Sequence, residues 1–226
     1  GSAPTGPLQR LDPETGQIEI LCDEIDGRPL VGNRTGIGVH TAEIARRLDP
    51  PPLIASHAVI ENAQGLERCG FRVDHSPLGV WWQQTILPDI DAEVLWGPHG
   101  TLPMSWKKPS VVTVHDFTSI TMPGRHRLKT ILSFNLFIGR SLEMATRVAC
   151  VSRAVADETM RGFGVAASKI ELVPNGVDDY FSPGGEEGDY LLFTGTLEPR
   201  KGIYDLFGAW WTFPEPRPRL LLAGDP

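Results

Sequence analysis

Short apolar runs alternate along this chain with segments in which apolar residues recur at helical spacing. Several runs are apolar throughout rather than alternating, as expected of strands covered on both faces. The predicted strands span residues 18–23, 52–56, 71–75, 92–98, 110–116, 147–152, 169–176, 190–195 and 219–224. Strand, helix and strand in repetition favour right-handed crossovers. The pattern predicts an α/β protein built on a doubly wound parallel sheet.

The helical segments lie between these strands. We expect helices over residues 36–48, 125–146, 152–164 and 202–211. In the first, Val39, Ile44 and Leu48 fall near one stripe. In the third, Ser152 is the expected N-cap, and Gly162 or Gly164 is the expected end.

A natural linker divides the chain. The segment FSPGGEEGDY, residues 181–190, is acidic, rich in Pro and Gly, and has no apolar period. We therefore predict one domain over residues 16–182 and the start of a second over residues 188–226. The second holds two predicted strands and one helix, and the chain stops directly after a strand. Our expectation is a fragment that ends inside its second domain.

Composition narrows the function classes. Of 226 residues, 41% are hydrophobic and 22% charged, with a net charge of −7, which argues against a non-specific nucleic-acid binder. Cys22, Cys69 and Cys150 have neither metal-ligand nor CxxC spacing, and we expect Cys22 and Cys150 to be buried, reduced thiols of an intracellular protein. No apolar run approaches the roughly 18 residues that span a bilayer.

Candidate chemistry follows the strands, because open parallel sheets bind ligands at the carboxyl ends of their strands. A glycine-rich loop with Gly36 and Gly38 follows the first strand and opens a helix, whose free N–H groups suit an anion. His115 and Asp116 follow the fifth strand. A histidine there either reaches into a cleft or caps the edge of the sheet.

The stretch FTGTLEPRKG, residues 193–202, places Arg200 and Lys201 at the start of a helix. That end of a helix already carries positive dipole charge, so cations are unfavourable there unless something negative lies opposite. Either the two side chains reach into water, or a phosphate-bearing ligand docks there.

Together these motifs carry a family resemblance over residues 18–226. The motifs are TGIGVHTAEIARRL (35–48), VVTVHDF (111–117), VACVSRAVADE (148–158), KIELVPNGVDDYFSP (169–183) and FTGTLEPRKGIYDLFGAW (193–210). In this order and spacing the chain resembles the retaining GT-B glycosyltransferases of family 4, the glycogen-synthase-like group. The resemblance implies a GT-B fold with two Rossmann-like domains, the second truncated here, and transfer of a sugar from a nucleotide-sugar.

The resemblance also implies roles for single residues. His115 matches the histidine directed at the donor sugar, with Asp116 as its positioning neighbour. Gly36 and Gly38 match the loop that faces the donor phosphates, and Lys201 matches the lysine that binds the donor diphosphate. The family's second phosphate cation is replaced by Thr196, and Arg200 is expected to compensate. The downstream E-x7-E glutamates have no counterpart.

By the same resemblance the donor is a GDP-, UDP- or dTDP-sugar, and no cofactor is involved. The acceptor is a saccharide or a lipid-linked saccharide, the place is the cytoplasm at the inner face of the membrane, and this fragment alone is inactive. We expect no metal, since Asp178-Asp179 is adjacent rather than spaced as DxD. Residues 124–140, basic first and apolar afterwards, either touch an anionic membrane or form an ordinary helix with one buried face.

Two other classes stay open. A catalytically incomplete GT-B module would only bind or regulate. A Rossmann-type oxidoreductase is disfavoured, because the GxGxxG spacing is absent and the second strand is followed by His57 rather than an acidic residue.

Overall fold

The computed structural model describes residues 9–11, 18–20, 22–122, 124, 128–177, 180–182, 184, 188–195, 197 and 201–224. The chain divides into two compact units, Gly1–Asn175 and Gly176–Pro226. The two units are described separately below.

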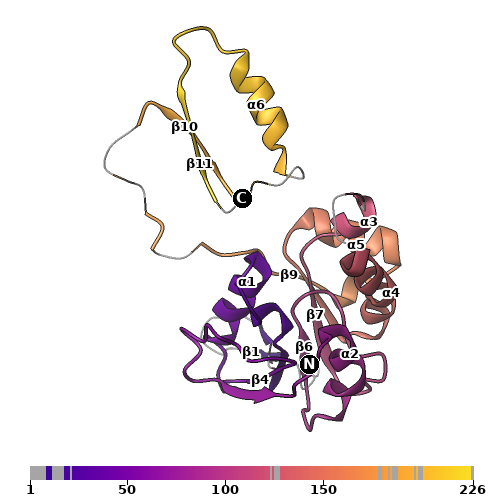
Figure 1. The fold of residues 1–226 in the computed structure, drawn as a ribbon. Coiled ribbons are helices and arrows are strands. Elements are labelled where there is room, and N and C mark those ends of the chain that lie inside the picture. The colour runs from indigo at the N-terminus through magenta and orange to yellow at the C-terminus, as the bar shows by residue number, and fades with distance from the viewer. Residues whose placement is uncertain are drawn as a thin grey trace. The chain divides into compact units, whose positions relative to one another are not determined.

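The first unit is built on a seven-stranded sheet in which every neighbouring pair of strands is parallel. Its strand order is β5-β4-β3-β6-β7-β8-β9 (Figure 1). The strands are β3 (Glu24–Asp26), β4 (Leu53–Ser56), β5 (Gly70–Val73), β6 (Leu95–Gly97), β7 (Ser110–Val114), β8 (Arg147–Cys150) and β9 (Ile170–Leu172). The chain thus runs outward from β3 to one edge and then returns to β6 to build the other half. This order confirms the predicted doubly wound, Rossmann-like α/β fold.

Helices cover both faces of this sheet, with α1 on one side and α2, α4 and α5 on the other (Figure 1). They are η1 (Arg28–Leu30), α1 (Gly36–Ala45), α2 (Gly79–Thr85), η2 (Leu87–Asp89), α3 (Thr118–Thr121), α4 (Leu128–Met144), α5 (Arg153–Phe163) and η4 (Ala167–Lys169). Adjacent strand residues point to opposite faces. Val111 accordingly packs with α1 residues in one core cluster, and Val112 packs with α4 and α5 residues in the other.

The first strand of the sheet lies later in the chain than its apolar pattern predicted. The prediction over residues 18–23 was wrong for the sheet: β3 is Glu24–Asp26, and β2 (Ile18–Ile20) pairs antiparallel with β1 (Gln9–Leu11). The Asp23 carboxylate accepts the backbone N–H groups of Glu93 and Val94 at 2.8 and 2.7 Å. It thereby joins the start of β3 to the segment before β6. The apolar pattern did not predict β3, because this strand places two acidic residues inside the sheet.

Helix α1 buries small residues rather than the predicted apolar stripe. Its buried positions are Gly38, Thr41, Ala42 and Ala45, while Val39 is 49% exposed. The helix packs so closely on η1 that a Cβ at Gly38 would lie 2.5 Å from the carbonyl oxygen of Pro29. Only small side chains fit between α1 and η1 at this distance. The larger Ile44 and Leu48 are only partly buried.

Other local predictions are confirmed. The Ser152 hydroxyl caps α5 by accepting the N–H of Val155, and Gly164 ends the helix in the left-handed region at φ 67°. Cys22 and Cys150 are buried free thiols, as is Cys69. Among the described helices, none combines the length and the hydropathy needed to cross a membrane.

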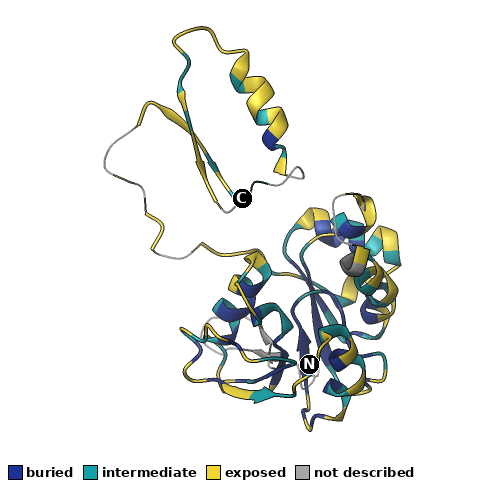
Figure 2. Ribbon diagram, viewed as in Figure 1, coloured by how far each residue is buried: buried dark blue, intermediate teal, exposed yellow. Residues whose placement is uncertain are grey.

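The described residues of the second unit form two parallel strands and one helix, as the sequence predicted. They are β10 (Tyr190–Thr194), α6 (Ile203–Trp211) and β11 (Arg219–Ala223). Of its described hydrophobic residues, only Ile203 is buried. Figure 2 shows the contrast between this largely exposed unit and the buried strands of the first unit.

Candidate functional site

The strand order reverses between β3 and β6, and ligands of open parallel sheets bind beyond the carboxyl ends of the strands at such a point. The segments that leave this edge of the sheet carry Arg28 after β3, His99 after β6 and His115 after β7. Helix α1 follows β3 and η1. The predicted Gly36, Gly38, His115 and Asp116 all lie in these segments.

His115 is held by the backbone at its Nε2 atom. This nitrogen lies 2.9 Å from the carbonyl oxygen of Pro98, and a carbonyl can only accept, so Nε2 carries the proton. Burial lowers the pKa of His115 below its usual value. The ring is therefore neutral at pH 7, and its Nδ1 lone pair is left to accept a hydrogen bond.

His40, on α1, packs against this ring, and sequence reasoning did not single it out. The two imidazoles meet edge to face with centroids 4.8 Å apart. Burial, and then the neighbouring His115, lower the pKa of His40 to about 4, although a hydrogen bond with the Asn175 side chain acts in the other direction. Its Nε2 is buried with no hydrogen-bond partner among the described atoms. The one sequence signal that could have indicated His40 is its position four residues after Gly36, on the same face of the helix.

Asp116 has a local role in the described structure. Its carboxylate accepts hydrogen bonds from the backbone N–H and the hydroxyl of Thr118, at 2.9 and 2.7 Å. These bonds fix the turn that begins α3. Its predicted part in positioning the donor sugar stays a prediction.

Gly36 and Gly38 form the first turn of α1, but their surroundings differ. The N-cap residue, Thr35, makes no side-chain hydrogen bond to this turn, and the turn contains no acidic residue, which leaves its N–H groups suited to an anion. A Cβ at Gly36 would meet nothing within 4 Å, whereas Gly38 is packed against Pro29. Packing alone thus requires glycine at position 38, and the phosphate role of both stays a prediction.

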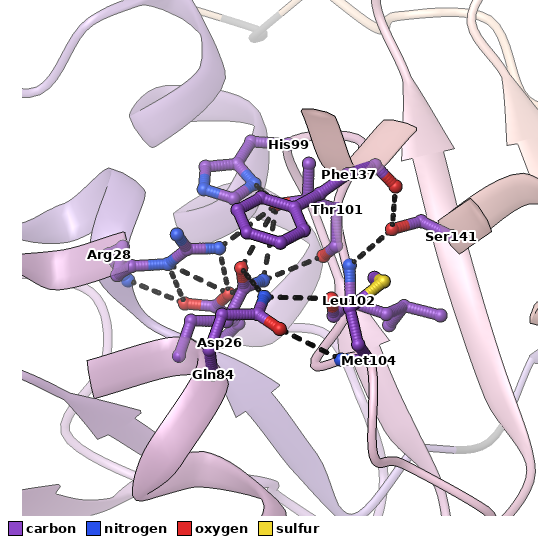
Figure 3. Close-up of polar contacts among 10 residues, drawn as sticks. Asp26, Arg28, Gln84, His99, Thr101, Leu102, Met104, Phe137 and Ser141 are labelled. Carbon is purple, nitrogen blue, oxygen red and sulfur yellow. Dashed lines mark hydrogen bonds and ion pairs between the residues drawn. The ribbon is translucent and has the colours of Figure 1, made fainter. Parts of the chain in front are cut away.

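Beneath this edge lies a buried ion pair that the sequence did not reveal. The Asp26 side chain is fully buried, and the Arg28 guanidinium contacts it with Nη2 2.6 Å from Oδ2 (Figure 3). Gln83 donates to the same carboxylate at 2.9 Å. Burial by itself would raise the pKa of Asp26, but the charge and hydrogen bonds of Arg28 outweigh it and lower the pKa. Arg28 is thereby committed to Asp26 rather than left for a substrate anion.

The polar network extends from this ion pair into the segment after β6. Arg28 donates to the Thr101 hydroxyl at 3.2 Å. Further along, Gln84 and Ser141 bind the backbone of Leu102 (Figure 3). His99 is half-buried beside Thr101, where burial and then the Arg28 charge lower its pKa to about 3. The network therefore connects the segments after β3 and β6 to α2 and α4 by hydrogen bonds, and it holds these segments in place beneath the site.

Lys201 lies in the second unit, where it is exposed and directly precedes Gly202, the N-cap of α6. Its predicted role at the donor diphosphate stays a prediction. Arg200, Thr196 and Asp178-Asp179, to which predictions were attached, lie outside the described residues. Within the described part of the chain, no three His, Cys, Asp or Glu side chains are grouped as a metal site would need.

Comparison with known proteins gives one family match, a curated relative and solved structures. Residues 92–180 match the model of Glycosyltransferase Family 4. The O-antigen chain mannosyltransferase B of Escherichia coli is 26% identical over 170 residues, which cover 68% of this chain and 43% of that protein.

The solved structures are of Anabaena Alr3699/HepE. Its complex with UDP and glucose has a TM-score of 0.59 and 16% identity, covering 91% of this chain and 62% of that one. Its complex with UDP-glucose has a TM-score of 0.59 and 19% identity, covering 89% and 60%. The chain thus spans less than two thirds of the length of each of these proteins.

Proposed function

Since this chain carries the family 4 glycosyltransferase match on a Rossmann-like sheet of the GT-B type, we propose that it forms part of an enzyme that moves a sugar from a nucleotide-sugar to an acceptor. The comparisons support the family 4 glycosyltransferase with a GT-B fold that the motifs predicted. One observation carries the proposal: the residues that match the family model, 92–180, include strands β6 to β9 and His115. His115 directly follows β7, which lies beside β6, the strand at which the strand order reverses.

In this proposal His115 positions the donor sugar rather than protonating it. Its Nε2–H is used by Pro98, so Nδ1 is the atom that accepts a hydrogen bond from a sugar hydroxyl. The lowered pKa keeps that lone pair free at neutral pH. His40 supports the ring from α1.

In this proposal the Lys201 ammonium group stabilises the negative charge of the leaving nucleoside diphosphate. As the glycosidic bond breaks, negative charge develops on the phosphates, and a donor held ready for that charge lowers the barrier by roughly 3–4 kcal/mol. Lys201 is exposed at the start of α6, with Arg200 beside it in sequence. The first-turn N–H groups of Gly36 and Gly38 are offered to an anionic group of a substrate in the same way. These groups supply the charge stabilisation in our proposal, which invokes no resident metal.

The proposed classes of sugar donor and acceptor are inferred from the proteins to which this chain is similar. A relative that is an O-antigen chain mannosyltransferase supports sugar transfer in polysaccharide synthesis, and complexes of HepE with UDP and UDP-glucose support a nucleotide-sugar donor. We propose retention of the anomeric configuration, a GDP-, UDP- or dTDP-linked donor, and a saccharide or lipid-linked acceptor. The chain without the rest of such an enzyme is proposed to be inactive.

A product assay on the full-length protein tests the proposal. Wild-type enzyme, His115→Ala and Lys201→Ala are incubated with a panel of GDP-, UDP- and dTDP-sugars, and products are identified by mass spectrometry. Lys201→Ala should abolish transfer with an unchanged circular dichroism spectrum, because the residue is exposed. His115→Ala should lower kcat by up to about 100-fold with little change in nucleotide affinity, because the donor sugar is no longer held in position.

Four outcomes would contradict the proposal or one of its residue roles. Wild-type turnover by Lys201→Ala would remove the diphosphate role, and an unchanged rate for His115→Ala would leave that residue as a cap of the sheet edge. Nucleotide binding without transfer by any donor would favour the binding or regulatory module. Stabilisation by NAD alone would favour the oxidoreductase.

A further inference from the structure

Five large apolar side chains are exposed on α3 and α4. Leu128, Leu132 and Leu136 lie on α4 and are 69%, 61% and 72% exposed. Ile120 on α3 and Met122 just after it are 39% and 51% exposed. We refer to these five residues as the leucine surface. Single exposed apolar residues are ordinary, but a group on two neighbouring elements marks an interaction site.

The geometry of α4 makes the surface continuous. The leucines are four residues apart, so they stack along one helix face for about 12 Å. Helix α3 packs on α4, with the Ser119 hydroxyl donating to Asn135 Oδ1 at 3.2 Å. This bond joins α3, which carries Ile120, to the middle of α4.

The leucine surface is not needed by the core of the first unit. The opposite face of α4 carries Ile138 and Leu142, which are almost completely buried against the sheet. Figure 2 shows this division of α4 into a buried side and an exposed side. An ordinary amphipathic helix would carry polar residues where these three leucines stand.

The charge of the segment indicates what lies against it. Residues 117–142 contain no Asp or Glu, in a chain that has 28 of them and a net charge of −7. The same residues include Arg125, Arg127 and Lys129 beside Leu128 in the sequence, whereas Arg140 is paired with Glu143 just beyond them. Apolar side chains inside a cationic, acid-free segment match an anionic lipid surface, where leucines enter the acyl boundary and cations meet headgroups.

We propose that the leucine surface is a peripheral contact with anionic membranes. In the sequence, α3 and α4, which carry this surface, come directly after the turn that contains His115 and Asp116. Its purpose rests on the proposed function: an enzyme docked in this way would meet a lipid-linked acceptor at the membrane. The binding itself is independent of sugar transfer.

Vesicle sedimentation tests this proposal on the chain as it stands. Wild type, Leu132→Glu and Val59→Glu are mixed with phosphatidylcholine vesicles, with and without 30% phosphatidylglycerol. Val59 is the matched control, an apolar residue that is 56% exposed outside the leucine surface. We expect wild type and Val59→Glu to sediment with the anionic vesicles, and Leu132→Glu to partition at least 10-fold less. Neutral vesicles should bind all three weakly.

The proposal is overturned if Leu132→Glu binds as wild type does, or if wild type fails to bind anionic vesicles. Light scattering in the same buffers identifies the competing occupant. A wild-type dimer that Leu132→Glu dissociates, without vesicle binding, would assign the surface to a second copy. The product assay with a water-soluble acceptor reads sugar transfer without vesicles, so the two proposals fail separately.

Discussion

At the scale of single residues, the molecule buries two carboxylates in β3, an interior strand of its sheet. Asp26 is neutralised by Arg28, but Glu24 is 1% exposed and its Oε1 has no hydrogen-bond partner among the described atoms. Burial, and then the charge of Asp23, raise the pKa of Glu24 to about 8. Glu24 is therefore protonated in the folded protein at neutral pH, and stability depends on it.

The pH dependence of unfolding tests this protonation. The pKa of Glu24 is raised from 4.5, so the folded state holds a proton that the unfolded state has lost. Stability should then fall as pH rises towards 8, by at most about 1.4 kcal/mol per pH unit. His40, His99 and His115, with lowered pKa values, act in the opposite direction until their unfolded forms lose the proton, about one pH unit above 6.5. The difference in urea unfolding between wild type and a Glu24 variant that cannot ionise therefore isolates Glu24 between pH 6.5 and 8.

Glu24→Gln provides the control, because an amide of the same shape cannot ionise. Both proteins share the histidine contribution, so we expect the free energy of unfolding of wild type to decline relative to that of Glu24→Gln between pH 6.5 and 8. Parallel curves for the two proteins would show that Glu24 does not carry the proton.

At the scale of elements, α1 lies against η1 and the sheet at a distance that small residues alone permit. Its first turn serves packing and, in our proposal, anion binding, and the two glycines separate these functions. Gly38 is in contact with the Pro29 backbone, whereas Gly36 faces open space. Alanine at each position should therefore affect different properties.

Gly38→Ala should destabilise the protein by about 1–3 kcal/mol, because its Cβ forces α1 away from η1. Gly36→Ala should leave stability unchanged within about 0.5 kcal/mol. Urea unfolding measures both. In the full-length enzyme, Gly36→Ala should weaken donor affinity if this turn faces phosphates. Equal losses of stability in the two variants would mean that the packing of α1 differs from that described.

At the scale of the whole molecule, both hydrophobic core clusters belong to the first unit. The second unit has Ile203 as its buried hydrophobic residue among those described, while Leu192, Leu221 and Phe207 are exposed. Hydrophobic burial is the main favourable term in folding, so stability should reside in the first unit.

Removal of residues 176–226 tests this distribution. Residues 1–175 should unfold in one cooperative transition, with a Tm within about 5 °C of that of the whole chain, because both core clusters are retained. Differential scanning calorimetry measures both proteins. Loss of the cooperative transition on truncation would show that the second unit supports the first.

Much of this architecture could be predicted from the sequence because its signals are local. Apolar runs marked the strands from β4 to β11, and Ser152 and Gly164 marked the ends of α5. Spaced motifs indicated the family and led to His115 at the end of a strand. Each of these depends on neighbours within a few residues, and the chain shows such neighbours directly.

Tertiary structure decided what depends on distant partners. The sequence does not show that Glu24 and Asp26 are buried: Arg28 and Gln83 compensate Asp26, and Glu24 is buried in its protonated form. The contact between His40 and His115 joins positions that the chain pattern treats as unrelated, and the exposure of Leu132 is known only when the other face of α4 is seen against the sheet. Periodicity states which residues share a face, whereas packing and charge compensation decide which face is buried.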